Sequence, residues 1–363
     1  MQLAPCPVRS GVTSIQSKMV QTADLNVHYL AAGEGGGLEP IVLLHGFPET
    51  SHSWRHQLPV LGAAGHPTFA IDSRGFGKTD KPRVRTTRAM LGDDVVRFLD
   101  ALDIDRAMVV GHDWGGIIAF KATIDHPERV SRVALLDTLC TVWSRAGAHG
   151  YWFKAEPLPE QFLAAHARAF IEVLFASGDP AALGTRPASP YGELKGKLAR
   201  PDWVDDEALA HYIDALADPD SQAAAIQYFR YALPFHRVTA DPSATHGERF
   251  ESLSERDVAA MWLHPHGLEQ HPGFQEYYDF GPEDRHKRSD APALWMYSKL
   301  RGHVPRGSVT DDATIPTGNP YLDQFSRYFA DLRVRAVDCG HFIPEEAPEY
   351  TSSVLLEFAA GTI

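Results

Sequence analysis

The chain has 363 residues, which is long enough for one large domain with an insertion or for two domains. Apolar residues make up 44% and charged residues 22%, as in ordinary globular proteins that are not embedded in a membrane. The formal net charge of −13 argues against a nucleic-acid or anionic-membrane partner, because little in the chain would neutralise phosphates.

The cysteines give a second indication of the environment. Cys6, Cys140 and Cys339 are odd in number and widely spaced, so we expect neither a disulfide framework nor a metal-binding pair. The N-terminal segment has no apolar stretch typical of a secretory signal, and no window suggests a transmembrane helix. We therefore expect a cytoplasmic protein without metal or cofactor, and leave open whether it forms a homodimer.

Short apolar segments alternate with helical patterns over the first 140 residues. The predicted strands lie at 25–33, 41–46, 68–72, 107–112 and 130–137, and the predicted helices at 87–104 and 114–127. Strands that alternate with helices through short glycine or aspartate turns predict a mostly parallel sheet covered by helices on both faces. The fold class is therefore α/β.

The alternation breaks after residue 140. Residues 141–290 are rich in helix formers and aromatic residues and show no strong strand pattern. Strands are predicted again at 292–300 and 334–341, followed by a closing helix near 350–361. We therefore predict a core domain formed by residues 1–140 and 291–363, interrupted by a helical cap, or lid, at 141–290.

The segment "GHDWGG" (111–116) lies at a predicted strand-to-helix turn. In many hydrolases a serine stands at the tip of such a turn, in the pattern Gly-x-Ser-x-Gly, but here the tip is Asp113. A carboxylate is poorly suited to attack an acyl carbonyl, but it can displace a leaving group from a saturated carbon. The product is an ester on the enzyme, which water must then hydrolyse.

Hydrolysis of such an ester needs a base and donors for the tetrahedral oxyanion. His341, in "DCGHF", stands after a glycine at the end of the predicted strand segment 334–341 and is therefore expected at the carboxyl edge of the sheet. The backbone amides of Phe47, in "HGFP", and of Trp114 are the candidate oxyanion hole. His45 and His112 are expected to hold loops by hydrogen bonds rather than to react.

The acid that orients His341 is less obvious. Asp137 ends the strand that follows the Asp113 helix, so it is expected on a neighbouring strand tip, and we favour it. Asp311 and Asp312 remain alternatives within a long loop. Each assignment also has a structural alternative: Asp113 as a helix N-cap, His341 as a loop residue and Asp137 as a turn residue.

Five motifs occur in an order that is typical of one superfamily: "HGFPETSHSWR" (45–55), "DSRGFGKTDKP" (72–82), "GHDWGG" (111–116), "HPERVSRVALLD" (126–137) and "DCGHF" (338–342). On these segments the chain resembles the α/β-hydrolase superfamily. Within it, the chain resembles the branch of epoxide hydrolases and haloacetate and haloalkane dehalogenases, which use an aspartate nucleophile. The resemblance implies the α/β-hydrolase fold and a triad of Asp113 as nucleophile, His341 as base and Asp137 as its partner.

The branch also implies a donor to the leaving group from the cap. Epoxide hydrolases use cap tyrosines, and dehalogenases use a tryptophan or histidine set, so the candidates are Tyr151, Trp152, Tyr228 and Tyr231. In "IQYFRYAL" (226–233) the register that aligns the arginine puts phenylalanine, not Tyr228, at the family's tyrosine. Structural packing is the alternative for each of these aromatic residues.

Two departures favour an epoxide hydrolase over a dehalogenase. The haloacetate enzymes carry arginines just after the nucleophile, whereas this chain reads "DWGGIIAF"; haloalkane enzymes with a donor asparagine carry it at the position of Phe47. We therefore predict an epoxide hydrolase acting on a small hydrophobic molecule. A hydrolytic dehalogenase with the same nucleophile is the alternative, followed by a non-catalytic ligand-binding relative.

Overall fold

The computed structural model describes residues 14–144, 150, 152–176, 203–234, 236–237, 277–299 and 320–363. Within these residues the main sheet has eight strands. In spatial order they are β1 (Gln16–Gln21), β2 (Asn26–Ala32), β4 (Thr68–Ile71), β3 (Ile41–Leu44), β5 (Ala107–His112), β6 (Val130–Leu136), β10 (Ala293–Ser298) and β11 (Leu332–Val337).

The strands from β4 to β11 pair in parallel, whereas β2 pairs antiparallel with both β1 and β4. This arrangement is the α/β-hydrolase fold, and it confirms the predicted mostly parallel sheet. Because parallel strands share one direction, the residues that follow β3, β5, β6 and β11 meet at the same edge of the sheet.

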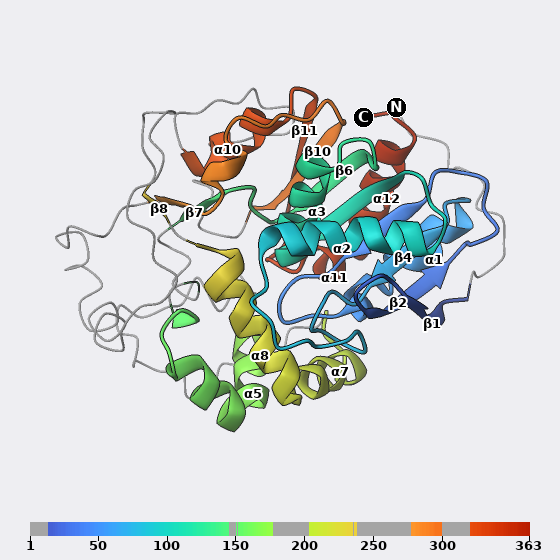
Figure 1. The fold of residues 1–363 in the computed structure, drawn as a ribbon. Helices are drawn as coiled ribbons and strands as arrows, with labels where there is room; N and C mark the ends of the chain where they lie inside the picture. Colours follow the sequence, from blue (N-terminus) through green and yellow to red (C-terminus); the bar gives the residue numbers. More distant parts are fainter. Residues whose placement is uncertain are drawn as a thin grey trace.

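Both faces of the sheet are covered by helices. Figure 1 shows α2 (Arg88–Ala101) and α3 (Trp114–Asp125) in front of the sheet, with α12 (Pro348–Ala359) behind it. The side chains of β5 alternate accordingly. Ala107 and Val109 join the core cluster that contains α2 and α3, while Met108 and Val110 join the cluster of α1 (Gln57–Ala63) and α12.

Between β6 and β10 the chain leaves the sheet and forms a group of helices, seen below the sheet in Figure 1. We call them the inserted helices: α5 (Leu158–Ala176), α7 (Asp206–Ala217), α8 (Pro219–Gln227) and the π-helix η2 (Tyr228–Ala232). They pack on one another, and Asp218 caps the N-terminus of α8. The helix formers that are frequent in residues 141–290 thus lie in helices in the described part of this region, with a break between α7 and α8 before Pro219.

The same region also contains strands, although its sequence shows no strong strand pattern. β7 (Val142–Ser144), β9 (Tyr277–Asp279) and β8 (His236–Arg237) pair antiparallel in a small second sheet. Each has only two or three residues, too few for a recognisable alternation of apolar and polar side chains.

None of the helices in the described parts of the chain is long and apolar enough to cross a membrane.

Candidate active site

The turn between β5 and α3 holds Asp113 in a rare backbone conformation, with φ 49° and ψ −117°. Residues other than glycine seldom adopt positive φ, and such strain is concentrated at functional sites. The neighbouring glycines permit the sharp turn. A Cβ atom on Gly111 would lie 2.1 Å from the carbonyl oxygen of Gly115, and a Cβ on Gly115 would lie 2.1 Å from the carbonyl oxygen of Leu44.

The carboxylate of Asp113 has a different partner on each oxygen. Oδ1 accepts a hydrogen bond from the amide of Phe47 at 2.9 Å, and Oδ2 lies 3.5 Å from Nε2 of His341. Burial by itself would raise the pKa of Asp113, but the nearby His341, the charge of His112 and the Phe47 amide outweigh it and hold this pKa below its usual range. The group is therefore ionised at neutral pH.

His341 follows β11 and is oriented by Asp137, which follows β6. Nδ1 of His341 lies 2.6 Å from Oδ2 of Asp137, and the other carboxylate oxygen accepts a hydrogen bond from the amide of Ser298 at 3.1 Å. The Asp137 backbone also has positive φ, at 40°. The structure thus brings together Asp113, His341 and Asp137. The alternatives Asp311 and Asp312 lie outside the described residues.

A second buried pair supports the main chain of His341. Nε2 of His112 lies 2.8 Å from the carbonyl oxygen of His341, and Nδ1 lies 3.0 Å from Oε2 of Glu49, which also accepts from the amide of Gly46. Burial lowers the pKa of His112, but the charge of Glu49 and its hydrogen bond outweigh burial and raise it to about 9. His112 therefore donates from both ring nitrogens and fixes the loop that carries His341.

His45 plays a similar part on the other side of the turn. Its Nδ1 donates to the carbonyl oxygen of Gly46 at 2.8 Å, and its Nε2 accepts from the amide of Ser73 at 3.0 Å. Burial lowers the pKa of His45, in agreement with a neutral ring that donates from one nitrogen and accepts at the other. These contacts confirm that His45 and His112 hold loops. Glu49 was not singled out from the sequence, and its only signal is its place directly after "HGFP".

Aromatic side chains form a buried wall beside the Asp113 turn. The ring of Phe229 is stacked on that of Phe153 at 4.2 Å, and it meets the rings of Trp114 at 5.1 Å and Phe47 at 5.6 Å. Trp152, half-buried, packs edge-on against Phe153 at 4.9 Å. Four of these five residues are almost fully buried, so the surroundings of the carboxylate are apolar on this side.

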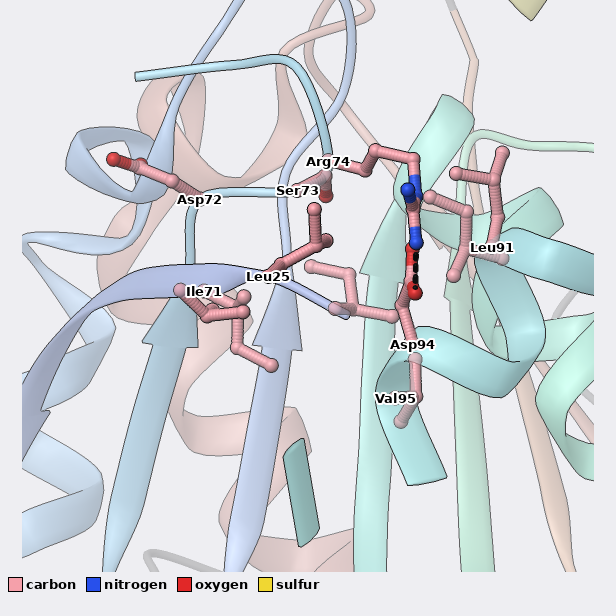
Figure 2. A pocket seen from close by; sticks show the side chains of 11 residues that line it. Leu25, Ile71, Asp72, Ser73, Arg74, Leu91, Asp94 and Val95 are labelled. Atoms are coloured by element: carbon pink, nitrogen blue, oxygen red, sulfur yellow. Dashed lines mark hydrogen bonds and ion pairs between the residues drawn. The ribbon is translucent and has the colours of Figure 1, made fainter. Parts of the chain in front are cut away.

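Tyr228 differs from the expectation that its hydroxyl serves as a donor to the leaving group. This hydroxyl donates to the carbonyl oxygen of Arg74 at 2.8 Å, and the side chain is almost fully buried. Arg74 is in turn fixed by a two-point ion pair with Asp94, drawn as a dashed contact in Figure 2, and both residues line a cavity of about 20 Å³. The phenol thus joins the inserted helices to the core, and we do not carry Tyr228 forward as a donor.

The other candidate donors have different surroundings. The guanidinium of Arg85 lies over the ring of Tyr231, 4.7 Å from its centre. Trp152 lies in the aromatic wall. Tyr151 lies outside the described residues.

No group of three or more His, Cys, Asp or Glu side chains that could hold a metal ion occurs among the residues that the structure describes. Cys140 and Cys339 are buried free thiols, and burial raises the pKa of Cys140. Cys6 precedes the described residues.

Comparisons with known proteins show what the whole chain is similar to. A family model described as "alpha/beta hydrolase fold" matches residues 39–348. Epoxide hydrolase A of Mycobacterium tuberculosis (strain ATCC 25618 / H37Rv) is 32% identical over 351 residues, which cover 95% of this chain and 97% of that protein. Epoxide hydrolase B of the same strain is 28% identical over 347 residues, with 88% and 91% covered.

The fold is also similar to that of solved structures. The structure described as epoxide hydrolase CorEH without ligand matches with a TM-score of 0.66 and 19% sequence identity, covering 96% of this chain and all of that one. At this identity the similarity concerns the fold alone.

Proposed function

Since the chain belongs to the family with the alpha/beta hydrolase fold and is a hydrolase, we propose that it opens epoxides to vicinal diols through an ester on Asp113. One observation carries the proposal. One oxygen of the Asp113 carboxylate accepts a hydrogen bond from the Phe47 amide, and the other lies 3.5 Å from Nε2 of His341. Nδ1 of His341 lies 2.6 Å from Oδ2 of Asp137. This is a nucleophile beside a base that a third group orients.

In the first step Oδ2 of Asp113 attacks a ring carbon of the epoxide and forms a carbon–oxygen bond to it. The bond between that carbon and the ring oxygen breaks, and the oxygen leaves as an alkoxide that takes a proton. The ionised state of Asp113, maintained by His341, His112 and the Phe47 amide, makes the attack competent at neutral pH. Tyr151 is our candidate for the proton donor, since Tyr228 is engaged with Arg74.

In the second step His341 takes a proton from a water molecule through Nε2, and the resulting hydroxide attacks the ester carbon of Asp113. The amides of Phe47 and Trp114 stabilise the oxyanion that forms. Collapse of this intermediate breaks the ester bond, and the departing alkoxide takes the proton from Nε2 of His341, so the diol is released with one water-derived oxygen left in Asp113. The proton of the new carboxyl group returns to the proton donor of the first step, which restores the ionised Asp113. Asp137 holds the imidazole in the required orientation and stabilises its charged form.

The substrate class follows from the environment. The wall formed by Phe47, Trp114, Phe153 and Phe229 presents apolar rings beside the nucleophile, which suits a hydrophobic or aryl-substituted epoxide. The two relatives from Mycobacterium tuberculosis, both named epoxide hydrolases and both matching most of their length, support the same reaction.

The test is incubation with an aryl epoxide and, separately, with a haloacetate in water enriched in ¹⁸O. We expect diol from the epoxide, no halide from the haloacetate, and incorporation of ¹⁸O into the peptide that contains Asp113 after several turnovers. Asp113→Asn should abolish both diol and label. Halide release without diol would contradict epoxide hydrolysis and favour a dehalogenase. Diol formation that survives Asp113→Asn would contradict the mechanism.

A further inference from the structure

A second pair of carboxylates lies behind the catalytic loop. Glu345 lies four residues after His341, in the short helix α11 (Ile343–Glu346). This helix packs on the turn η1 (Ser51–Trp54). Glu49 lies two residues before the start of η1. The side chains of Glu49 and Glu345 are both completely buried. Two acids enclosed at one place in the core are costly when both are ionised.

Each of these acids has one satisfied oxygen and one oxygen without a partner. Oε2 of Glu49 accepts from His112 and from a backbone amide, whereas Oε1 has no hydrogen-bond partner among the described residues. Oε1 of Glu345 accepts from Arg55 at 2.7 Å and from the hydroxyl of Tyr212, whereas its Oε2 has no partner within that same part of the chain. Native structures rarely leave buried carboxylate oxygens unsatisfied.

We propose that Glu345 is a positioning residue that holds a proton on Oε2 and donates it to Oε1 of Glu49. One proton gives both unpartnered oxygens a hydrogen bond, since the protonated carboxyl of Glu345 is a donor and the ionised carboxylate of Glu49 is an acceptor. Glu49 then keeps its ion pair with His112, and His112 keeps the carbonyl oxygen of His341 in place. The structural part stands alone, while its effect on turnover rests on the proposed function.

The charges around the pair agree with a shared proton. Burial and the charge of Glu49 raise the pKa of Glu345 to about 7, and Arg55 and Tyr212 lower it by a smaller amount. The cation of His112 balances Glu49. The positive charge of Arg55 also interacts with the negative charge of Asp205, which lies at the N-terminus of α7. Arg55 therefore does not neutralise Glu345 alone.

The pair also joins two parts of the molecule. Tyr212 lies on α7, one of the inserted helices, whereas Arg55 follows η1 and Glu345 lies on α11 in the core. If Glu345 ionises, its negative charge repels that of Glu49 beneath the loop that carries His341. We therefore expect the alignment of His341, and with it the hydrolysis of the ester, to worsen as the pH rises through the pKa of Glu345 of about 7.

The experiment combines infrared spectroscopy of the whole protein with a pH profile. A protonated buried carboxyl gives a C=O stretching band that ionised carboxylates lack. We expect such a band in the wild type at pH 6, its loss between pH 6 and 8, and its absence from Glu345→Gln. The matched control is Glu349→Gln, the same change at an exposed glutamate at the start of α12, which should retain the band.

Activity gives the second measurement. With an aryl epoxide, wild-type kcat should fall up to about tenfold from pH 6 to pH 8, since one unit above its pKa an acid is about 10% protonated. Glu345→Gln, whose amide can both donate to Glu49 and accept from Tyr212, should lack this fall. Tyr212→Phe removes a hydrogen-bond donor to ionised Glu345, which should raise the pKa of Glu345. Both the loss of the infrared band and the fall in kcat should therefore occur at higher pH.

A wild-type spectrum without a band that depends on Glu345 would overturn the proposal, whatever the activity. If kcat falls equally from pH 6 to pH 8 in the wild type and in Glu345→Gln, the positioning role is overturned. If Glu345→Gln fails to fold, the spectra of the wild type and Tyr212→Phe decide between the same outcomes. Absence of epoxide turnover would count against the proposed function alone, because the infrared measurement does not depend on it.

Discussion

Oδ2 of Asp137 and Nδ1 of His341 lie 2.6 Å apart, although 204 residues separate them in the chain. Asp137 follows β6 and His341 follows β11, and both strands pair with β10 in parallel. The amide of Ser298, at the end of β10, holds the second oxygen of Asp137. The contact therefore depends on three adjacent strands of one sheet.

This contact predicts the effect of Asp137→Asn. The amide no longer stabilises the charged imidazole and can favour the wrong tautomer, so kcat should fall by up to about 10⁴-fold, the effect of the same change in a Ser-His-Asp triad. Steady-state kinetics with an aryl epoxide measures it. Asp311→Asn and Asp312→Asn are the matched controls and should stay close to the wild type. A larger loss in either control than in Asp137→Asn would reassign the orienting acid.

Replacing the base should trap the intermediate. In His341→Gln the first step can proceed on Asp113, but no imidazole is present to activate water for the second. After mixing with substrate, the intact protein should gain the mass of one substrate molecule, as measured by mass spectrometry. The double variant with Asp113→Asn should gain none. An adduct in that double variant would show that another residue is alkylated.

The tyrosines should separate into a structural and a reactive residue. Tyr228→Phe loses the hydrogen bond to Arg74, so the free energy of unfolding should fall by about 1 kcal/mol while turnover stays near that of the wild type. Tyr151→Phe should lose turnover by on the order of 10²-fold, the usual contribution of a general acid. Urea unfolding and epoxide kinetics on both variants measure this. The reverse pattern would restore Tyr228 as the donor.

The Asp113 turn should not tolerate a methyl group at Gly115. A Cβ there would lie 2.1 Å from the carbonyl oxygen of Leu44, so α3 must move away from β3. Gly115→Ala should lower the free energy of unfolding by about 1–3 kcal/mol and reduce turnover. Gly37→Ala is the control, since a Cβ there meets nothing within 4 Å. Equal stability of the two variants would argue against this packing.

The buried pair of Glu49 and His112 predicts a pH-dependent stability. Its environment raises the pKa of His112 from 6.5 to about 9. The stabilisation is therefore fully present below pH 6.5 and is lost as the pH rises through 9. The loss should be on the order of 3 kcal/mol, which urea unfolding from pH 6 to pH 10 measures. Glu49→Gln should flatten the dependence, and an unchanged slope would contradict the ion pair.

Much of the fold could be predicted from the sequence because its signals are local. Strand and helix periods, and the glycines around Asp113, depend on neighbouring residues only, and they predicted the parallel sheet and the turn. The order of strands in such a sheet then implied that His341 and Asp137 lie at one edge. Strands of two or three residues, such as β7 and β8, carry too little periodicity to be seen.

The inserted helices show what the sequence could not decide. Successive residues of a helix point about 100° apart, so a shift of one residue decides which of Tyr228, Phe229 and Tyr231 approaches the nucleophile. The structure has a π-helix at this point, with the Tyr228 hydroxyl on Arg74 and the Tyr231 ring against Arg85. Packing against the core, which no local pattern contains, selected this register.

The sequence by itself determined the chemistry available at one edge of a sheet: a carboxylate at a sharp strand-to-helix turn, a histidine and an acid, each near the carboxyl end of a strand. Only the tertiary structure decided that the side chains of Glu49 and Glu345 are both completely buried. The local signals are weak, since Glu49 has only its place directly after "HGFP" and Glu345 has none. Their burial and their unsatisfied oxygens depend on packing between separate parts of the chain, such as that of α11 on η1.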